Sequence, residues 1–193
     1  YHHISGEEAP HAEGERFPEV LGRELTELAK EDPRICAITA ATGFGCGLDP
    51  FAAAHPDRFF DVGIAEEHAC TFAAGLAANG MIPCFAVYSS FLQRAYDNIL
   101  HDVALQRLPV KLFIDRAGLS MADGPTHHGV FDVSFLSGIP NISIYAPATL
   151  GSLRAAVRRA IAVSGPVAVR YPNATEDRRI AELFYPEGDY ENF

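Results

Sequence analysis

Short hydrophobic runs alternate along the chain with longer segments in which hydrophobic residues recur every three or four positions. The short runs are rich in Val, Ile and Phe, as in buried β-strands, and cover residues 35–39, 59–64, 82–88, 110–115, 142–146 and 167–170. The longer segments have helical periodicity and cover residues 18–30, 66–79, 91–105 and 150–163, with a short helix at 49–55. This alternation predicts an α/β fold, doubly wound around a mainly parallel sheet with helices on both faces.

Several predicted helix ends carry residues that favour them. Pro18 suits the first turn of the first helix, and Asp49 followed by Pro50 predicts an N-cap and a first-turn proline. Gly80 is placed to end the helix at 66–79, and Thr149 is placed to cap the last helix.

Length and composition allow a single domain. A chain of 193 residues, of which 48% are hydrophobic, can bury a full core. Residues 1–16 are polar without periodicity, and residues 174–193 are acidic and loop-like. We therefore expect linkers or tails at both ends of a domain at 17–173, as in one domain of a longer protein.

Charge and cysteine spacing exclude several classes of protein. The net charge of −10 argues against a nucleic-acid partner. No hydrophobic run is long enough to span a bilayer, and the first residues lack the hydrophobic core of a signal peptide, so we expect no membrane association and a cytoplasmic location. The four cysteines have neither CxxC nor metal-ligand spacing, which predicts reduced thiols in the core.

The most informative segment joins the strand at 59–64 to a helix made almost wholly of small and apolar residues. Glu66 and Glu67 open this helix, where unpaired N–H groups and the helix dipole favour an acid. The helix is too apolar to be a solvated element, so we expect it to be buried. Adjacent helical residues point about 100° apart, which leaves one carboxyl group for a cap and one for proton transfer.

Polar residues gather where the predicted strands end. They are the glycine-punctuated residues 43–47, Glu66, residues 88–94, residues 115–128 and Arg170. The carboxyl ends of parallel strands meet at one edge of a sheet, which is where open α/β folds bind ligands. We therefore expect one active site at this edge.

The segment at 115–129 contains two acids, one arginine, two histidines and three glycines. It is either an Ω-loop, with Asp123 as a turn former and His127 as a polar filler, or a loop of the active site. The second interpretation is favoured, because histidine transfers protons near neutral pH. Since the adjacent His127 and His128 diverge and have no partner at HxH or HxxxH spacing, we expect no metal site in this chain.

Arg94 follows the strand at 82–88 and leaves two interpretations open. It either pairs with Asp97 at i+3 on the same helix, or it reaches an anionic substrate, since the planar guanidinium suits phosphate. The glycines at 43–47 have the wrong spacing for a dinucleotide loop and predict a plain turn. Three arginines of the last helix are expected to form a solvated face without chemistry: Arg154, Arg158 and Arg159.

Four sequence blocks together resemble one enzyme family. They are residues 61–76, the block YSSFLQRAYD with the following HDVA at 88–104, the loop at 115–129, and VRYP at 169–172. They resemble the pyrimidine-binding domain of the 1-deoxy-D-xylulose-5-phosphate synthases, thiamine-diphosphate-dependent relatives of transketolase. The resemblance runs from about Phe17 to Asn173, and FLQRAYD and ADGPTHHG separate it from transketolase and from the pyruvate dehydrogenase β-subunit.

The resemblance implies which residues contact the cofactor. Glu66 matches the glutamate that hydrogen-bonds a ring nitrogen of the aminopyrimidine and promotes the tautomer that removes the thiazolium proton. A partly protonated carboxyl group in an apolar setting would suit this role. Phe91 matches the aromatic residue that stacks on the pyrimidine, and Tyr88 lies near the reacting centre. Glu67 stands where the family usually has glutamine.

The resemblance also implies which residues contact the substrates. Arg94, Arg116 and Arg170 match positions linked to the triose phosphate or its acceptor site. Asp123 and His127 match polar residues that face the intermediate, and we count His127 among the catalytic residues. His2 matches a histidine of the family's interdomain linker.

Cofactors and partners follow from the same resemblance. The whole enzyme decarboxylates pyruvate and joins the two-carbon unit to glyceraldehyde 3-phosphate, a step of isoprenoid biosynthesis. A GDG…N motif binds Mg²⁺ and the diphosphate in a domain that this sequence does not contain. We expect that domain in the same or another chain, a homodimer, and no activity of this part alone. The rival interpretation is a stand-alone subunit that assembles with a partner chain carrying the diphosphate domain.

Overall fold

The computed structural model describes residues 14–120, 123–177, 179 and 181, so His2 and most of the two predicted tails lie outside the described residues. A six-stranded sheet with strand order β2-β1-β3-β4-β6-β5 forms its centre, and every neighbouring pair is parallel. The strands are β1 (Ile35–Thr39), β2 (Phe59–Asp61), β3 (Ile82–Tyr88), β4 (Lys111–Asp115), β5 (Ser143–Tyr145) and β6 (Val167–Arg170). The predicted doubly wound α/β fold is confirmed.

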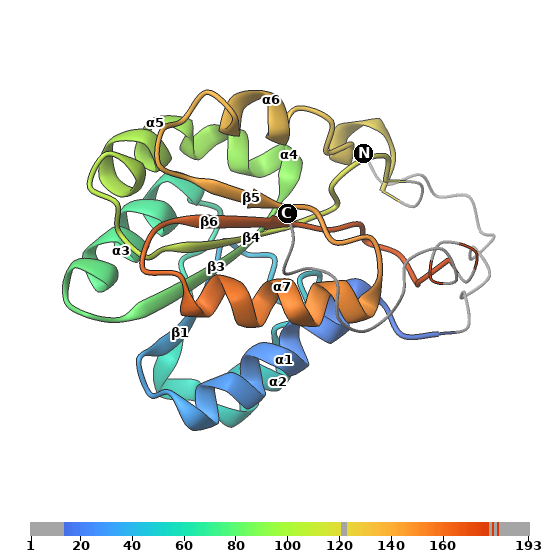
Figure 1. The fold of residues 1–193 in the computed structure, drawn as a ribbon, viewed down its shortest axis with the longest axis horizontal. Helices are drawn as coiled ribbons and strands as arrows, with labels where there is room; N and C mark the ends of the chain where they lie inside the picture. Colours follow the sequence, from blue (N-terminus) through green and yellow to red (C-terminus); the bar gives the residue numbers. More distant parts are fainter. Residues whose placement is uncertain (1–13, 121–122, 178, 180, 182–193) are drawn as a thin grey trace.

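Helices cover both faces of the sheet (Figure 1). One face carries α1 (Phe17–Glu31), α2 (Asp49–Ala54) and α7 (Leu150–Ala162), with the 3₁₀ turn η1 (Pro56–Arg58) beside α2. The other carries α3 (Glu66–Ala78), α6 (Asp132–Leu136) and a continuous helical segment made of α4 (Ser89–Leu92), η2 (Gln93–Ala95), α5 (Tyr96–Asn98) and η3 (Ile99–Ala104). A further 3₁₀ turn, η4 (Pro125–His127), lies in the loop after β4.

The core consists of two hydrophobic layers, one on each side of the sheet. Along β3, Cys84 and Ala86 belong to the layer under α1 and α7, whereas Phe85 and Val87 belong to the layer under α3. This alternation follows from the two-residue period of a strand, and burial on both faces explains the continuous hydrophobic runs in the sequence. All four cysteines are free and buried, as predicted.

Lys111 is an unusual member of the core. It lies at the amino end of β4 with no exposed surface, and its Nζ donates to the backbone oxygens of Val163 and Gly165 at 2.6 and 2.7 Å. Burial lowers the pKa of its ammonium group from 10.5 to about 8. The side chain thereby joins the centre of the sheet to the turn after α7.

Some helix and strand boundaries differ from the prediction. The strand predicted at 59–64 ends at Asp61, because the Asp61 Oδ1 accepts from the backbone N–H groups of Ala41 and Gly63 and turns the chain. Asp49 is the first residue of α2 rather than its N-cap, a position that Leu48 occupies. Thr149 does cap α7, in a reciprocal box with Ser152.

The helix predicted at 91–105 starts two residues earlier and is not a regular α-helix. It changes from α to 3₁₀, back to α, and then to π-helical hydrogen bonding. A hydrophobic period near 3.6 fits all these forms, so the sequence pattern cannot separate them. The five-residue helix α6 was not predicted.

Helix α3 is buried on one side only, which corrects the expectation that the whole element is buried. Its alanines pack against the sheet, whereas Thr71 and Gly75 lie on an exposed side. The helix is therefore covered on one side only, and its exposed side carries Glu67, His68 and Thr71 beside small residues.

Two glycines allow α1 to cross the turn at 43–47 with its backbone in contact. A Cβ on Gly22 would lie 1.7 Å from the Gly47 carbonyl oxygen, and one on Gly47 would lie 2.2 Å from the Pro18 oxygen. Gly47 also has φ +72°, which disfavours other residues. The plain turn expected here is confirmed as a tightly packed one.

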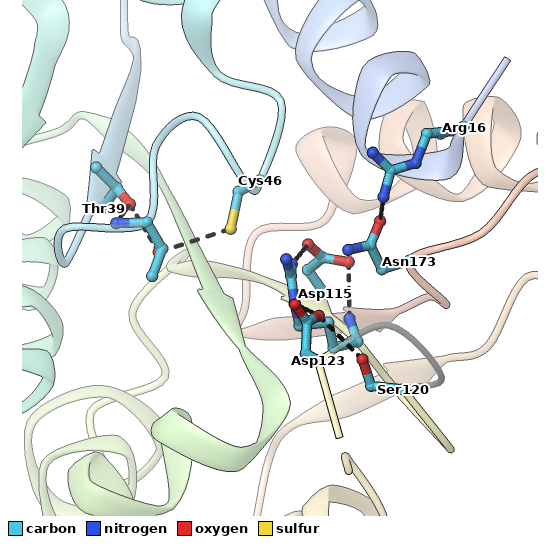
Figure 2. Close-up of polar contacts among 9 residues, drawn as sticks. Arg16, Thr39, Cys46, Asp115, Ser120, Asp123 and Asn173 are labelled. Atoms are coloured by element: carbon cyan, nitrogen blue, oxygen red, sulfur yellow. Dashed lines mark hydrogen bonds and ion pairs between the residues drawn. The ribbon is translucent and has the colours of Figure 1, made fainter. Parts of the chain in front are cut away.

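The two ends of the domain lie side by side. Arg16 and Thr175 form an antiparallel bridge, and the Phe17 N–H donates to the Ala174 oxygen at 3.0 Å. The Arg16 guanidinium also contacts the Asn173 side chain (Figure 2).

Candidate functional site

The residues predicted to bind cofactor and substrates lie at the carboxyl edge of the sheet. Hydrogen bonds and ring contacts connect seven of the eight into one set: Glu66, Tyr88, Phe91, Arg94, Arg116, Asp123 and His127. The eighth, Arg170, ends β6 and pairs in register with Ile114 of the neighbouring β4.

Glu66 is buried at the first position of α3, where Ala65 is the N-cap. Its side chain is 2% exposed, and its Oε1 accepts from Arg94 Nη1 at 2.6 Å. Glu67 is exposed. Of the two adjacent acids, Glu66 therefore faces the site. Arg94 pairs with Glu66 rather than with Asp97, whose carboxylate contacts His101 Nδ1 at 2.9 Å.

Three rings line the site next to this pair. The Tyr88 and Phe91 ring centres are 5.3 Å apart, as are those of Phe91 and His127. The Arg94 guanidinium lies 5.1 Å from the centre of the Phe91 ring. Tyr88 ends β3, Phe91 lies in α4 and His127 in η4, so three separate elements form this aromatic wall.

Arg116 is the centre of a second, more deeply buried group, of which Asp115, Ser120 and Asp123 are labelled in Figure 2. Its Nη1 contacts the Asp115 carboxylate at 2.5 Å and its Nε donates to Asp123 at 2.7 Å. The Ser120 hydroxyl donates to the same Asp123 oxygen. The guanidinium also stacks on Tyr88, 3.5 Å from the ring centre. Arg116 therefore joins the loop after β4 to the aromatic wall.

Arg116 has a left-handed backbone with φ +60°. This conformation is uncommon for residues other than glycine and costs about 1–2 kcal/mol. It directs the chain out of β4 while the side chain turns back to Asp115, so the ion pairs oppose this backbone cost.

Burial and neighbouring charge shift several pKa values in this group. Burial raises the pKa of Asp115 to about 7, although the adjacent Arg116 opposes the shift. Burial also raises the pKa of Tyr88 to about 12. For Asp123, burial would raise the pKa, but the Arg116 charge and hydrogen bond outweigh burial and lower it. Asp115 is thus the acid of this group that titrates near neutral pH.

Arg170 is held by an acid from another element. Its Nε and Nη2 donate to the two carboxylate oxygens of Asp132, at 2.8 and 3.3 Å. Asp132 is the first residue of α6, and its side chain is 1% exposed.

A cavity of about 790 Å³ lies between the turn at 43–47, the start of α1 and the Arg116 group. Its lining includes Thr42, Gly45, Tyr88, Arg116, Arg16 and Asn173. A Cβ on Gly45 would lie 1.8 Å from the Tyr88 hydroxyl, so the glycine at this position lets the Tyr88 ring lie against the turn. A cavity of this size accommodates a small-molecule ligand.

Sequence reasoning gave no role to two acids of the site, Asp115 and Asp132. Asp115 was included only as one of the two acids of the loop at 115–129, and Asp132 lies in the helix that was not predicted. An acid at a strand end and the arginine directly after it were the available signal for Asp115.

Among the described residues, no group of three or more His, Cys, Asp and Glu side chains could hold a metal ion. Within the same part of the chain, no helix is long and apolar enough to cross a membrane.

Comparison with known sequences identifies relatives over most of the chain. Residues 16–175 match the family model for the transketolase pyrimidine binding domain. A 1-deoxy-D-xylulose-5-phosphate synthase from Alkaliphilus oremlandii is 53% identical over 96% of this chain, and one from Symbiobacterium thermophilum is 59% identical over 81%. These matches cover 30% and 24% of the two relatives, so the chain spans about a quarter to a third of their length.

Solved structures agree with this assignment. A structure described as a split gene transketolase, inactive beta4 tetramer, aligns with a TM-score of 0.78 and 31% identity, over 92% of this chain and 56% of that one. Transketolase from Leishmania mexicana aligns with a TM-score of 0.76 over 88% of this chain and 27% of that one, and at 19% identity it supports the fold alone. With its all-parallel sheet and its match over residues 16–175, the chain belongs to the family of transketolase pyrimidine-binding domains.

Proposed function

We propose that this chain is the pyrimidine-binding domain of a 1-deoxy-D-xylulose-5-phosphate synthase. The whole enzyme would decarboxylate pyruvate and join the two-carbon unit to glyceraldehyde 3-phosphate. The observation that carries the proposal is the buried Glu66 carboxyl group, whose partner Arg94 lies over the Phe91 ring, within a chain whose relatives bear that enzyme's name.

The residues at the site fit an aminopyrimidine ring. Glu66 offers a carboxyl group shielded from water, and the wall formed by Phe91, Tyr88 and His127 offers flat surfaces for a ring to stack on. Thiamine diphosphate, when bound, would supply the chemistry that stabilises the negative charge left by decarboxylation. Glu66 and Phe91 would bind and orient its pyrimidine, with Tyr88 beside them.

Glu66 has the further task of moving a proton. Its carboxyl group can take up or give a proton at an oxygen atom, and burial keeps bulk water from competing with that transfer. Arg94 donates to the Oε1 atom of Glu66, so a ring nitrogen that bonded this oxygen would compete with Arg94. His127 would be the second proton-transfer group. Its ring and the Arg94 guanidinium both contact the Phe91 ring.

Three arginines are assigned to the anionic substrates. Arg94 and Arg170 retain exposed side-chain surface, 48% and 22%, and would contact the phosphate of the aldehyde. Arg116 is 8% exposed, and it would contribute to the same site together with Asp123.

The site needs a second surface to enclose it, which we assign to a diphosphate-binding domain in the same or another chain. That domain would bind Mg²⁺ and the diphosphate, for which this sequence has no GDG…N motif. Two large apolar side chains near the carboxyl edge support the assignment, since Phe44 is 86% and Ile64 is 81% exposed. The part of the exposed side of α3 formed by Thr71, Gly75 and Ala78 would pack in a homodimer. The free, buried cysteines suit the reducing cytoplasm, where we place the enzyme.

Paired substitutions of Glu66 and Glu67 test the proposal in the protein that also contains the diphosphate domain. Glu66→Gln retains shape and hydrogen bonding but cannot transfer a proton. In this variant, exchange of the cofactor's thiazolium proton for deuterium should slow by roughly 10²–10⁴-fold. The exchange is measured by NMR on acid-quenched samples. Glu67→Gln is the matched control and should leave exchange nearly unchanged, because Glu67 is exposed. Equal losses, or a larger loss for Glu67→Gln, would contradict the assignment.

A further inference from the structure

Asp132 and Arg170 form a contact with a defined geometry. The guanidinium meets the carboxylate side-on, through Nε at 2.8 Å and Nη2 at 3.3 Å. Two parallel bonds fix the plane of the arginine as well as its position. The side-on contact uses one edge of the guanidinium and turns the Nη1 edge away from Asp132.

Asp132 and Arg170 differ in how far their side chains are exposed. The Asp132 side chain is 1% exposed, whereas that of Arg170 is 22% exposed. A ligand at the carboxyl edge can therefore contact Arg170 but not the acid behind it. Any effect of Asp132 on such a ligand has to pass through the arginine.

The contact also joins two elements of the site. Arg170 ends β6, beside β4 and its Asp115–Arg116 group, while Asp132 begins α6, which packs against α4, the helix that carries Phe91. The position of Arg170 relative to Phe91 is thus fixed through Asp132 as well as through the sheet.

We propose that Asp132 is a positioning residue, which directs the Arg170 guanidinium toward the phosphate of the aldehyde substrate. The inference rests on the proposed function. A phosphate recognised by a planar fork of donors is sensitive to the direction of that fork. Loss of the Asp132 carboxylate should therefore weaken binding of the phosphorylated substrate while leaving pyruvate binding unchanged.

The test uses the synthase that contains this domain together with its diphosphate domain. Asp132→Asn retains the shape of the side chain but turns a donor toward Arg170. We expect the KM for glyceraldehyde 3-phosphate to rise roughly tenfold or more, with the KM for pyruvate within about twofold of the wild-type value. Asp132→Glu, which keeps the charge on a longer side chain, should restore part of the affinity for glyceraldehyde 3-phosphate. It also provides a second test of the inference if Asp132→Asn does not fold.

A double-mutant cycle separates positioning from general loss of structure. If Asp132 acts through Arg170, adding Asp132→Asn to Arg170→Gln should not raise the KM for glyceraldehyde 3-phosphate further. Glu24→Gln is the control, because Glu24 contacts Arg158 at 2.5 Å where α1 packs on α7. It should lower the unfolding midpoint without changing either KM.

Several results would overturn the inference. They are an unchanged KM for glyceraldehyde 3-phosphate in Asp132→Asn, an equal rise for both substrates, or additive effects in the cycle. If the wild-type protein forms no 1-deoxy-D-xylulose 5-phosphate, the proposed function is wrong and this inference falls with it. Wild-type turnover with an unchanged KM in Asp132→Asn refutes the positioning role alone.

Discussion

Replacing Lys111 by methionine should remove one part of the pH dependence of stability. The ammonium group is fully buried, and its pKa falls from 10.5 to about 8. At about 1.4 kcal/mol per pKa unit, keeping this group charged in the folded protein costs roughly 3 kcal/mol below pH 8. Methionine has a similar length and no charge, but it leaves the Val163 and Gly165 oxygens without the Nζ donor, at about 1–3 kcal/mol each.

The sign of the pH effect follows from which state keeps the proton. Between about pH 8 and 10.5 the unfolded chain retains the Lys111 proton and the folded protein has lost it, so this group makes stability rise with pH. Burial raises the pKa of Cys36 to about 11 and of Cys70 to about 12, so these thiols ionise first in the unfolded chain and lower stability above about pH 9. The wild-type chain and Lys111→Met both contain these thiols, so the contribution of the thiols cancels in the difference between the two free energies of unfolding.

Urea unfolding followed by far-UV circular dichroism measures this difference. The free energy of unfolding of wild type minus that of Lys111→Met should increase by about 2 kcal/mol between about pH 7 and pH 9.5. Lys30, the other lysine of the chain, pairs with Glu27 on the surface, so Lys30→Met should give a difference from wild type that is flat over the same range. A flat or falling difference for Lys111→Met would refute the reasoning.

Two further predictions concern packing and activity. Gly47→Ala should destabilise the chain by roughly 2–4 kcal/mol, because it combines a left-handed backbone with a clash against Pro18. Gly75→Ala, in an open position of α3, should instead stabilise it by about 0.5–1 kcal/mol, and equal thermal midpoints for the two variants would contradict this contrast. The purified chain alone should decarboxylate no pyruvate and bind thiamine diphosphate with Mg²⁺ weakly in calorimetric titrations, and measurable turnover would show that a phosphate site was overlooked.

The strands could be predicted from the sequence because each is a hydrophobic run buried on both faces. Helix α6 could not, because five residues show no helical period and its hydrophobic contacts come from distant segments. The segment at 89–104 was recognised as helical, but its change from α to π-helical bonding depends on packing that a hydrophobic pattern does not record.

The site shows the same division between local and distant information. Its cofactor-facing and substrate-facing candidates could be named because they cluster at strand ends and match a known motif. Which acid contacts which arginine could not, since Glu66 and Arg94 are 28 residues apart and Asp132 and Arg170 are 38 apart. The residue pattern alone left open which of Glu66 and Glu67 faces the site. The family resemblance assigned that role to Glu66, and in the structure Glu66 is buried while Glu67 is exposed.

The bridge between Arg16 and Thr175 has a consequence for gene architecture. Because the first and last residues of the domain lie side by side, a longer polypeptide can carry it as an insert whose two connections are adjacent. The surrounding protein then needs to supply one attachment point rather than two distant ones. Folds with this property are easily moved between genes, fused to new neighbours or separated into their own reading frames.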